Sequence, residues 1–228
     1  MYIFDDIYKL ADILTDETTM KFETQIIRIK EKLTKLKNSD QDFEIFGSDT
    51  HEYNLNPTKT EFEIEKFETE NQITLPEDYR EFLLHIGNGG AGPYYGLEPL
   101  EAGREVDLDY KDGKDLIDLS KPFPFTEHWN VEFEEINDDN YEEIDQQKIE
   151  NYYDNKFVSG LLRISNFGCG VRMNIVVNGN EKGNIWVDDR VNENGLFPDP
   201  YFEQTEKITF LDWYELWLDK SLEEKNIS

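Results

Sequence analysis

The sequence predicts an α+β fold in which an antiparallel sheet is flanked by helices and preceded by an N-terminal helical extension. Apolar residues recur at helical spacing near the N-terminus and again over residues 79–86. Strand-like alternation appears only later, over residues 171–177, and the Asn178–Gly179 pair that follows is typical of a hairpin turn. Helices, then antiparallel hairpins, then a closing helix are the order expected of the α+β class.

The first part of the chain is expected to be helical. An apolar stripe covers residues 3–14, and a longer stripe with steps of three and four covers residues 22–36. Lysines gather in the second half of the longer stripe, where the C-terminal end of a helix favours cations. Residues 38–57 are polar and irregular and predict a linker. We therefore expect an N-terminal helical extension and linker over residues 1–57, and a main domain over residues 58–228.

Two helices are expected to open the main domain. The first covers residues 58–71, where apolar positions stand among glutamates. The second lies in the run LPEDYREFLLHIGNGG of residues 75–90, and both of its ends are marked. Pro76 suits the first helical position, and the glycines and Asn88 after Ile86 favour the left-handed conformation of a C-cap.

Residues 98–154 stand out as an acidic insertion. They contain 19 Asp and Glu against five Lys and Arg, so a quarter of the chain carries half of its net charge of −28. Phe123, Phe125 and Trp129 interrupt the charged residues. We expect these aromatic side chains to hold the insertion on the domain, and the insertion to be ordered at least in part.

Strands and a last helix follow. The runs 161–164 and 171–177 predict two strands, and residues 183–187 predict the strand that returns after the turn. Thr209 is the expected N-cap of the last helix, with Asp212 as its acidic partner. The face of this helix is aromatic, with Phe210, Trp213, Tyr214 and Trp217.

Charge and cysteine content limit the partners and the compartment. A net charge of −28 argues against nucleic acid and anionic membranes as ligands, and it favours a cationic partner or simply high solubility. Cys169 is the single cysteine, so an intramolecular disulfide and a cysteine zinc site are excluded. The N-terminus carries acids where a signal peptide carries lysines, and no window of 18 apolar residues occurs. We expect a cytosolic protein.

Two loop motifs resemble ligand sites but fail in their details. The run GNGGAG, residues 87–92, follows a helix instead of a strand and lacks the Lys-Ser/Thr pair of a phosphate loop. Acidic residues precede Gly113, but a calcium loop with glycine at its sixth position would place Leu108 and Leu119 at ligand positions. Neither motif predicts a bound nucleotide or metal.

The other reactive side chains show no catalytic pattern. His51, His85 and His128 have no metal-ligand spacing to one another or to the cysteine. Cys169 is interpreted as a small buried side chain. A pair of carboxylates suited to glycoside chemistry stays open among 51 acidic residues, but no spacing singles one out.

Several separate motifs resemble the SUKH superfamily, the Smi–Knr group of bacterial immunity proteins and their eukaryotic regulatory relatives. The run IEKFE at residues 64–68 and the run at residues 75–90 are similar to its signature. The run MNIVVNG from Met173, GNIWVDD from Gly183 and ITFLDWYELWL from Ile208 resemble its sheet and closing helix. The resemblance covers roughly residues 58–220, although the acidic insertion is longer than the family core needs and the N-terminal helices lie outside the pattern.

The resemblance implies a SUKH-like α+β fold without catalytic activity or cofactor. Bacterial members of the superfamily typically bind a cognate toxin, often a nuclease, and block it. The resemblance implies that the motif residues build the fold and that the contacts to the toxin vary between members. The residues carried over as structural are Leu75, Pro76, Tyr79, Phe82, Asn88 and Gly89.

We therefore expect an immunity protein that neutralises a protein toxin with a cationic nuclease domain, and no metal site. An acidic inhibitor is steered to the cationic cleft of a nuclease and can occupy the place of its substrate. The residues expected to contact the toxin are Glu98, Glu101, Asp107, Asp109, Phe123, Phe125, Trp129, Glu132, Glu134, Glu135, Asp138, Asp139, Glu142 and Glu143. Two alternatives stay open: a non-enzymatic scaffold or regulator, and a hydrolase that uses carboxylates.

Overall fold

The computed structural model describes residues 22–106, 116–131, 146–200, 202 and 206–226. A four-stranded antiparallel sheet lies at its centre, with the strands in chain order. The strands are β1 (Leu161–Gly168), β2 (Val171–Val176), β3 (Ile185–Asp189) and β4 (Gly195–Pro198).

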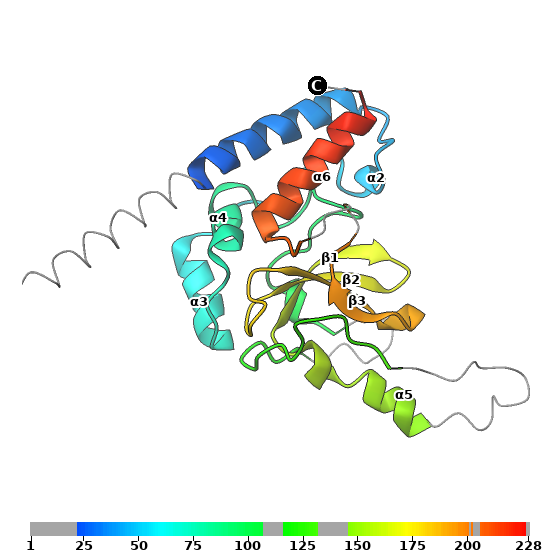
Figure 1. Cartoon of the computed structure of the whole chain (residues 1–228). Helices are drawn as coiled ribbons and strands as arrows, with labels where there is room; N and C mark the ends of the chain where they lie inside the picture. The colour runs from blue at the N-terminus through cyan, green and yellow to red at the C-terminus, as the bar shows by residue number, and fades with distance from the viewer. Residues whose placement is uncertain (1–21, 107–115, 132–145, 201, 203–205, 227–228) are drawn as a thin grey trace, which may run out of the picture.

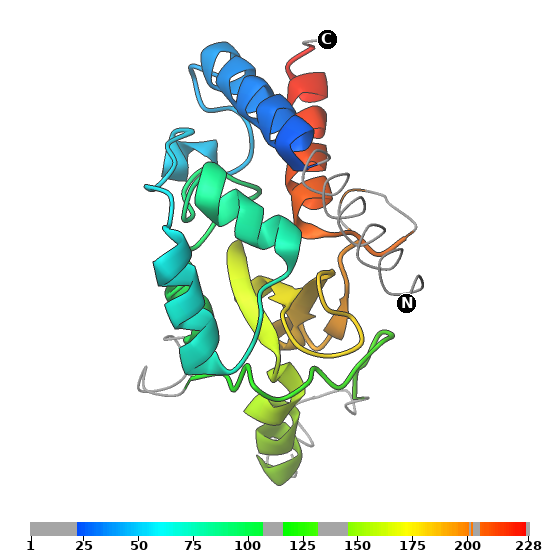
Figure 2. The same ribbon diagram turned by 90° about the vertical axis from the view of Figure 1, so that its left-hand side faces the viewer.

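Helices cover the sheet from two sides (Figures 1 and 2). An N-terminal helix (residues 22–39), α4 (Glu77–His85) and α6 (Phe210–Glu224) lie on one side. The short helix α5 (Gln146–Tyr152) lies on the other side, at the opposite end of the molecule from α2 (Ser48–His51). Helix α3 (Glu61–Asn71) runs beside the sheet, and the α+β class is confirmed.

The register of the strands gives one apolar face and a second face that mixes apolar and charged residues. Met173 pairs with Val187 and Ile175 pairs with Ile185, and all four side chains are buried. Arg172 pairs with Asp188 on the opposite face of the same two strands, because neighbouring residues of a strand point to opposite sides. The second face, which we call the insertion-side face, carries Trp186 and Asp188, through which Phe123 and α5 of the acidic insertion are attached.

The turn between β2 and β3 differs from the predicted one. The hydrogen bond from Gly183 N to Val176 O (2.8 Å) closes the hairpin, so Asn178–Gly179 does not form a two-residue turn. Asn178 instead binds the insertion. Its side-chain Nδ2 donates to Ser120 O (2.8 Å), and its main-chain carbonyl oxygen accepts from Phe123 N (2.8 Å). The tertiary contact overrides the local turn preference.

Of the described helices, α6 has the most buried residues. A side chain of α4 caps its N-terminal end. Trp213, Tyr214 and Leu218 are fully buried. Thr209 is the N-cap as predicted, but its side chain makes no capping bond to the helix backbone. Asp78 of α4 accepts from Leu211 N instead (3.1 Å), so a carboxylate from another helix satisfies one of the free N–H groups.

The predicted apolar stripe of the N-terminal helix packs into the same hydrophobic core. Ile26, Ile29, Leu33 and Leu36 are buried in it. Glu215 of α6, which is 11% exposed, ties the two helices together by accepting from Arg28 Nε (2.9 Å) and Lys32 Nζ (2.8 Å) and from Gln25. The helix is therefore held by both apolar packing and ion pairs.

Residues 38–57, predicted as a linker, also contribute to the core. Asp40, Ile45 and Ser48 are buried, and Asp40 has no exposed side-chain surface. The division of the chain at residue 57 stays a prediction, but residues 22–57 share one core with the sheet and its helices.

Acid is predicted to destabilise the protein through Glu215 and Asp40. Burial alone would raise the pKa of Glu215, but hydrogen bonds from Arg28 and Lys32 lower the pKa to about 2. Burial acts in the same way on Asp40, and hydrogen bonds from Tyr53, the Glu44 N–H and Lys225 lower its pKa to about 2. Because the folded pKa lies below the unfolded one, folding favours the ionised form, and this stability is lost as pH falls from about 4 toward 2.

The measurement is the free energy of unfolding in urea at several pH values between 7 and 2.5. Glu215→Gln should lower it by about 2 kcal/mol at pH 7 and should flatten its decline below pH 4. Glu223→Gln is the matched control, because Glu223 is an exposed residue of the same helix. An unchanged pH profile in Glu215→Gln would contradict the prediction.

A second prediction concerns the cap of α6. Asp78→Ala should lower the free energy of unfolding by about 1–2 kcal/mol, because Leu211 N then loses its acceptor. Glu77→Ala removes an exposed acid from the same turn of α4 and should cost less than about 0.5 kcal/mol. Equal effects of the two substitutions in urea unfolding would show that the cap contributes nothing.

Candidate protein-binding site

The acidic insertion is described over residues 98–106, 116–131 and 146–154. Five of the predicted contact residues lie in these parts: Glu98, Glu101, Phe123, Phe125 and Trp129. The other nine lie outside the described residues: Asp107, Asp109, Glu132, Glu134, Glu135, Asp138, Asp139, Glu142 and Glu143.

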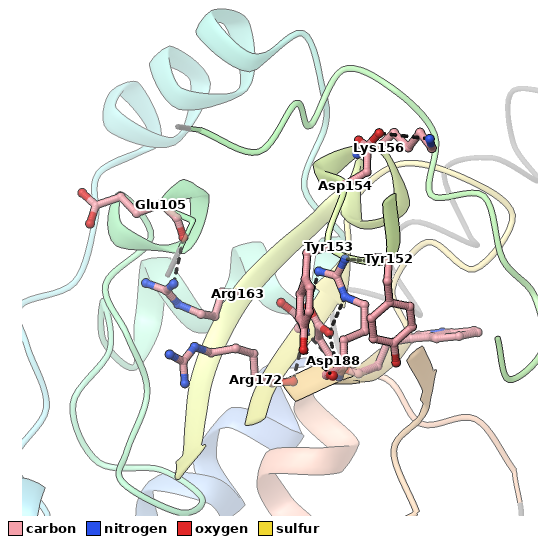
Figure 3. Close-up of polar contacts among 11 residues, drawn as sticks. Glu105, Tyr152, Tyr153, Asp154, Lys156, Arg163, Arg172 and Asp188 are labelled. Carbon is pink, nitrogen blue, oxygen red and sulfur yellow. Dashed lines mark hydrogen bonds and ion pairs between the residues drawn. The ribbon is translucent and has the colours of Figure 1, made fainter. Parts of the chain in front are cut away.

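The ends of the segment 107–115 are held together on the insertion-side face. Glu105 and Leu116 form an antiparallel bridge, and Ile117 N donates to Arg104 O (2.8 Å). Arg163 of β1 fixes the first end by donating through Nη1 to Glu105 O (2.8 Å), a contact shown in Figure 3. An acidic segment therefore leaves and rejoins the domain at one place.

Both described glutamates of the predicted site are bound to basic groups of their own chain. Glu98 accepts from Arg163 Nε (2.6 Å). Glu101 pairs with Lys59 and accepts from Asn88 Nδ2 (3.1 Å). Partial burial raises the pKa of Glu101, but the bonds from Lys59 and Asn88 outweigh it and lower the pKa. These two carboxylates hold the start of the insertion in place.

The three predicted aromatic anchors point toward the domain. Phe123 is 4% exposed and packs edge-on against Trp186 of β3, with ring centroids 4.8 Å apart. Phe125 and Trp129 are half-buried and stack on each other at 4.8 Å. Trp129 also contacts Phe157 at 4.4 Å. The rings attach the insertion to the sheet, and Phe123 does not form part of the surface.

Backbone pairing adds to this attachment. Trp129 N donates to Leu196 O and Leu196 N donates to Trp129 O, both at 2.8 Å. Residue 129 therefore covers part of the free edge of β4, which would otherwise offer unpaired backbone groups. The Tyr152 hydroxyl of α5 donates to Asn130 Oδ1 (2.8 Å), so this strand-like segment is also joined to the helix.

Arg190 fixes the C-terminal end of α5 on the sheet. Its guanidinium donates to both carboxylate oxygens of Asp188, at 2.8 and 2.7 Å, and through Nη1 to Tyr152 O (3.2 Å). Tyr153 Oη donates back to Arg190 O (2.9 Å), and Figure 3 shows both tyrosines beside Asp188. Burial raises the pKa of Tyr152 to about 12, so its hydroxyl stays a proton donor at neutral pH. The segment 132–145 thus has a fixed point on each side, Asn130 and Tyr152.

Comparison with known proteins gives one match. Residues 59–207 match the SMI1 / KNR4 family (SUKH-1), which is more than half of the chain. The chain belongs to this family. No curated protein and no solved structure matches. The superfamily inferred from the sequence motifs is confirmed.

The matched region shows which parts of this SMI1 / KNR4 protein lie outside the family match. Helices α3 and α4, the acidic insertion and the whole sheet lie inside residues 59–207. The N-terminal helix, α2 and α6 lie outside them, although they share the core. Residues 22–57 and α6 therefore lie outside the matched range but inside the same core.

Charge in the insertion of this SMI1 / KNR4 protein is concentrated between the fixed points. Segments 107–115 and 132–145 together contain 12 Asp and Glu and two Lys. The described parts of the insertion contain seven acids and three bases, and several of these are paired within the chain. The strongest negative charge of the sequence thus belongs to the two segments whose ends the sheet holds.

Within the described ranges, other chemistry finds little support. No group of three His, Cys, Asp or Glu there could hold a metal ion. None of the helices in those ranges is long and apolar enough to cross a membrane. The interpretation of Cys169 as buried is wrong, because it is exposed at the turn between β1 and β2. This turn has two residues in the left-handed conformation, and a side chain at its tip cannot reach the core.

Sequence reasoning missed the two arginines that hold the insertion. Arg163 interrupts the apolar run of β1, and Arg190 follows two aspartates at the end of β3. Basic residues inside or beside a strand in so acidic a chain were a usable signal, because such a side chain needs an acidic or carbonyl partner when it is buried.

Removal of the Arg190 guanidinium is predicted to release α5. Arg190→Gln should lower the free energy of unfolding by about 2–4 kcal/mol, because Asp188 loses its buried partner and Tyr152 O loses a donor. It should also speed hydrogen exchange of the α5 amides. Lys156→Gln breaks an exposed pair with Asp154 and should cost less than about 0.5 kcal/mol. The same small effect in both variants would show that Arg190 does not hold the helix.

Proposed function

We propose that this protein is an immunity protein that binds a cognate bacterial toxin and neutralises it through the acidic insertion. The observation that carries the proposal is the charge of the insertion, 19 acids against five bases, on a chain of the SMI1 / KNR4 family. Proteins of this family are generally non-enzymatic immunity proteins. Toxins of the nuclease class are proposed as the target, because their phosphate-binding clefts are cationic.

The arrangement of the insertion supports inhibition by occupation of the cleft. The sheet holds both ends of segment 107–115 through Arg163 and the Glu105–Leu116 bridge. It holds the flanks of segment 132–145 through Trp129, Asn130 and Arg190. Fixed ends lower the entropy that acidic segments lose when a partner binds them. The protein then competes with nucleic acid for the same cationic groups.

The direct test is co-expression with each candidate nuclease toxin domain found in the gene neighbourhood. Cells that produce the toxin domain should grow only when this protein is also present. A purified equimolar complex should have no nuclease activity. Full nuclease activity in the presence of excess protein would remove the proposal.

A kinetic prediction tests the role of charge. Replacement of Glu134, Glu135, Asp138 and Asp139 by Ser or Asn should slow association with the toxin domain about 3- to 10-fold, and added salt should slow association of the unchanged protein. Stopped-flow fluorescence measures both rates.

The matched control removes four charges elsewhere. Replacement of Glu23, Glu31, Glu65 and Glu77 by Gln also removes four negative charges, at exposed positions of helices outside the insertion. This variant should associate at nearly the original rate at physiological salt, because these charges lie outside the insertion. If both variants associate equally fast, long-range attraction by the insertion is not the mechanism, although an immunity role could still hold.

A non-enzymatic scaffold or regulator is the alternative, since the superfamily also has eukaryotic regulatory relatives. The gene neighbourhood separates the two functions. A neighbouring gene for a large toxin with a C-terminal nuclease domain favours the immunity role, and a partner without toxicity favours the scaffold.

A further inference from the structure

A loop at the far end of the molecule from α5 is organised by a buried carboxylate. Asp40 follows the N-terminal helix, and its side chain accepts from Glu44 N (2.9 Å), Ile45 N (3.2 Å) and Tyr53 Oη (2.6 Å). Lys225 Nζ lies 3.1 Å from Asp40 Oδ1, the oxygen that also accepts from Glu44 N. Loop 40–47 therefore has one well-defined conformation, because each of these bonds would be lost if the loop moved.

This rigid loop holds Phe46 outward. The Phe46 side chain is 54% exposed, and its ring lies 5.2 Å from that of Tyr95, which is 42% exposed. Phe167 at the end of β1 lies 6.1 Å from Phe46. We call Phe46, Tyr95 and Phe167 the aromatic patch. Phe167 is half-buried, and Phe46 and Tyr95 are exposed. Single exposed apolar residues are common, but adjoining exposed rings are typical of protein contact sites.

The border of the aromatic patch is acidic. Residues 40–53 contain five Asp and Glu and no Lys or Arg. Asp42, Asp49 and Glu52 are exposed, and the exposed Glu44 is paired with Lys225. Anionic membranes and nucleic acid are disfavoured by this charge. The patch suits a protein segment whose apolar side chains contact the aromatic rings and whose Lys or Arg side chains contact the acidic residues.

We propose that the aromatic patch and loop 40–47 form a second docking surface, which binds a basic amphipathic segment of a partner protein. Loop 40–47 and α2 lie at the opposite end of the molecule from α5, which ends the acidic insertion (Figures 1 and 2). It does not depend on the proposed immunity function. Loop 40–47 with Phe46 lies outside the family match, whereas Tyr95 and Phe167 lie inside it.

The single cysteine provides a local reporter. Cys169 is exposed in the turn that follows Gly168, and a Cβ atom at Gly168 would lie 3.0 Å from the Tyr95 ring. A trifluoromethyl tag on Cys169 of the full chain therefore reports on the aromatic patch by fluorine NMR. The probe is a 14-residue helical peptide of Leu and Lys with one apolar face, and the comparison peptide has Glu in place of Lys.

We expect a saturable shift of the tag with the Leu/Lys peptide and none with the Leu/Glu peptide. Phe46→Ser should weaken the affinity about tenfold or more, since a central aromatic contact is lost. Phe62→Ser is the matched control, because Phe62 is 73% exposed on α3 and belongs to no aromatic cluster of the described residues. Unchanged circular dichroism checks that each variant is folded, and Tyr95→Ser gives a second variant of the patch.

Three results would overturn the proposal. The first is equal affinity in Phe46→Ser, Tyr95→Ser and Phe62→Ser. The second is peptide binding that leaves the tag unchanged and disappears in the Glu134, Glu135, Asp138 and Asp139 variant, which would place the peptide on the acidic insertion. The third is a shift that depends on protein concentration without peptide, which would assign the patch to a second copy of this chain.

Discussion

The burial of helix α6 is the constraint on which the rest of the structure depends. Its aromatic face is too wide for one neighbour, and nine of its residues are buried. The rings of Phe210 and Tyr214 lie 5.0 and 4.9 Å from Phe82 of α4, while the N-terminal helix packs on the same core. Two carboxylates align these layers: Asp78 from α4 caps the start of α6, and Glu215 of α6 binds the N-terminal helix. Residues 22–57, outside the family match, are thus needed to complete the core.

On the other side of the sheet, different interactions hold the structure together. There, aromatic rings and two arginines attach an insertion whose charge would otherwise repel it from an acidic domain. Trp129 and Phe123 supply apolar contact, and Arg163 and Arg190 bind carbonyl groups of the main chain. Apolar burial and charge-assisted hydrogen bonds are only weakly affected by net charge. The acidic segments can therefore carry like charges without loss of their attachment.

The two proposed surfaces use negative charge in different ways. In the insertion the charge belongs to segments between fixed points, and attraction at long range is its main physical effect. At the aromatic patch the charge lies in the segment of Phe46, whose loop Asp40 holds, so contact requires a partner with matched apolar groups. A cationic partner suits both surfaces, but only the second surface selects for its shape.

The sequence by itself determined the α+β class, the family, the apolar stripe of the N-terminal helix and the concentration of charge in residues 98–154. Each of these is a local spacing, a motif or a composition, and is complete within a short stretch. Only the tertiary structure decided the use of Asn178, the exposure of Cys169, the inward direction of Phe123 and the roles of Arg163 and Arg190. The bond from Asp78 to Leu211 spans 133 residues of sequence. Such contacts depend on which distant segments the fold brings together, and local sequence preferences do not indicate this.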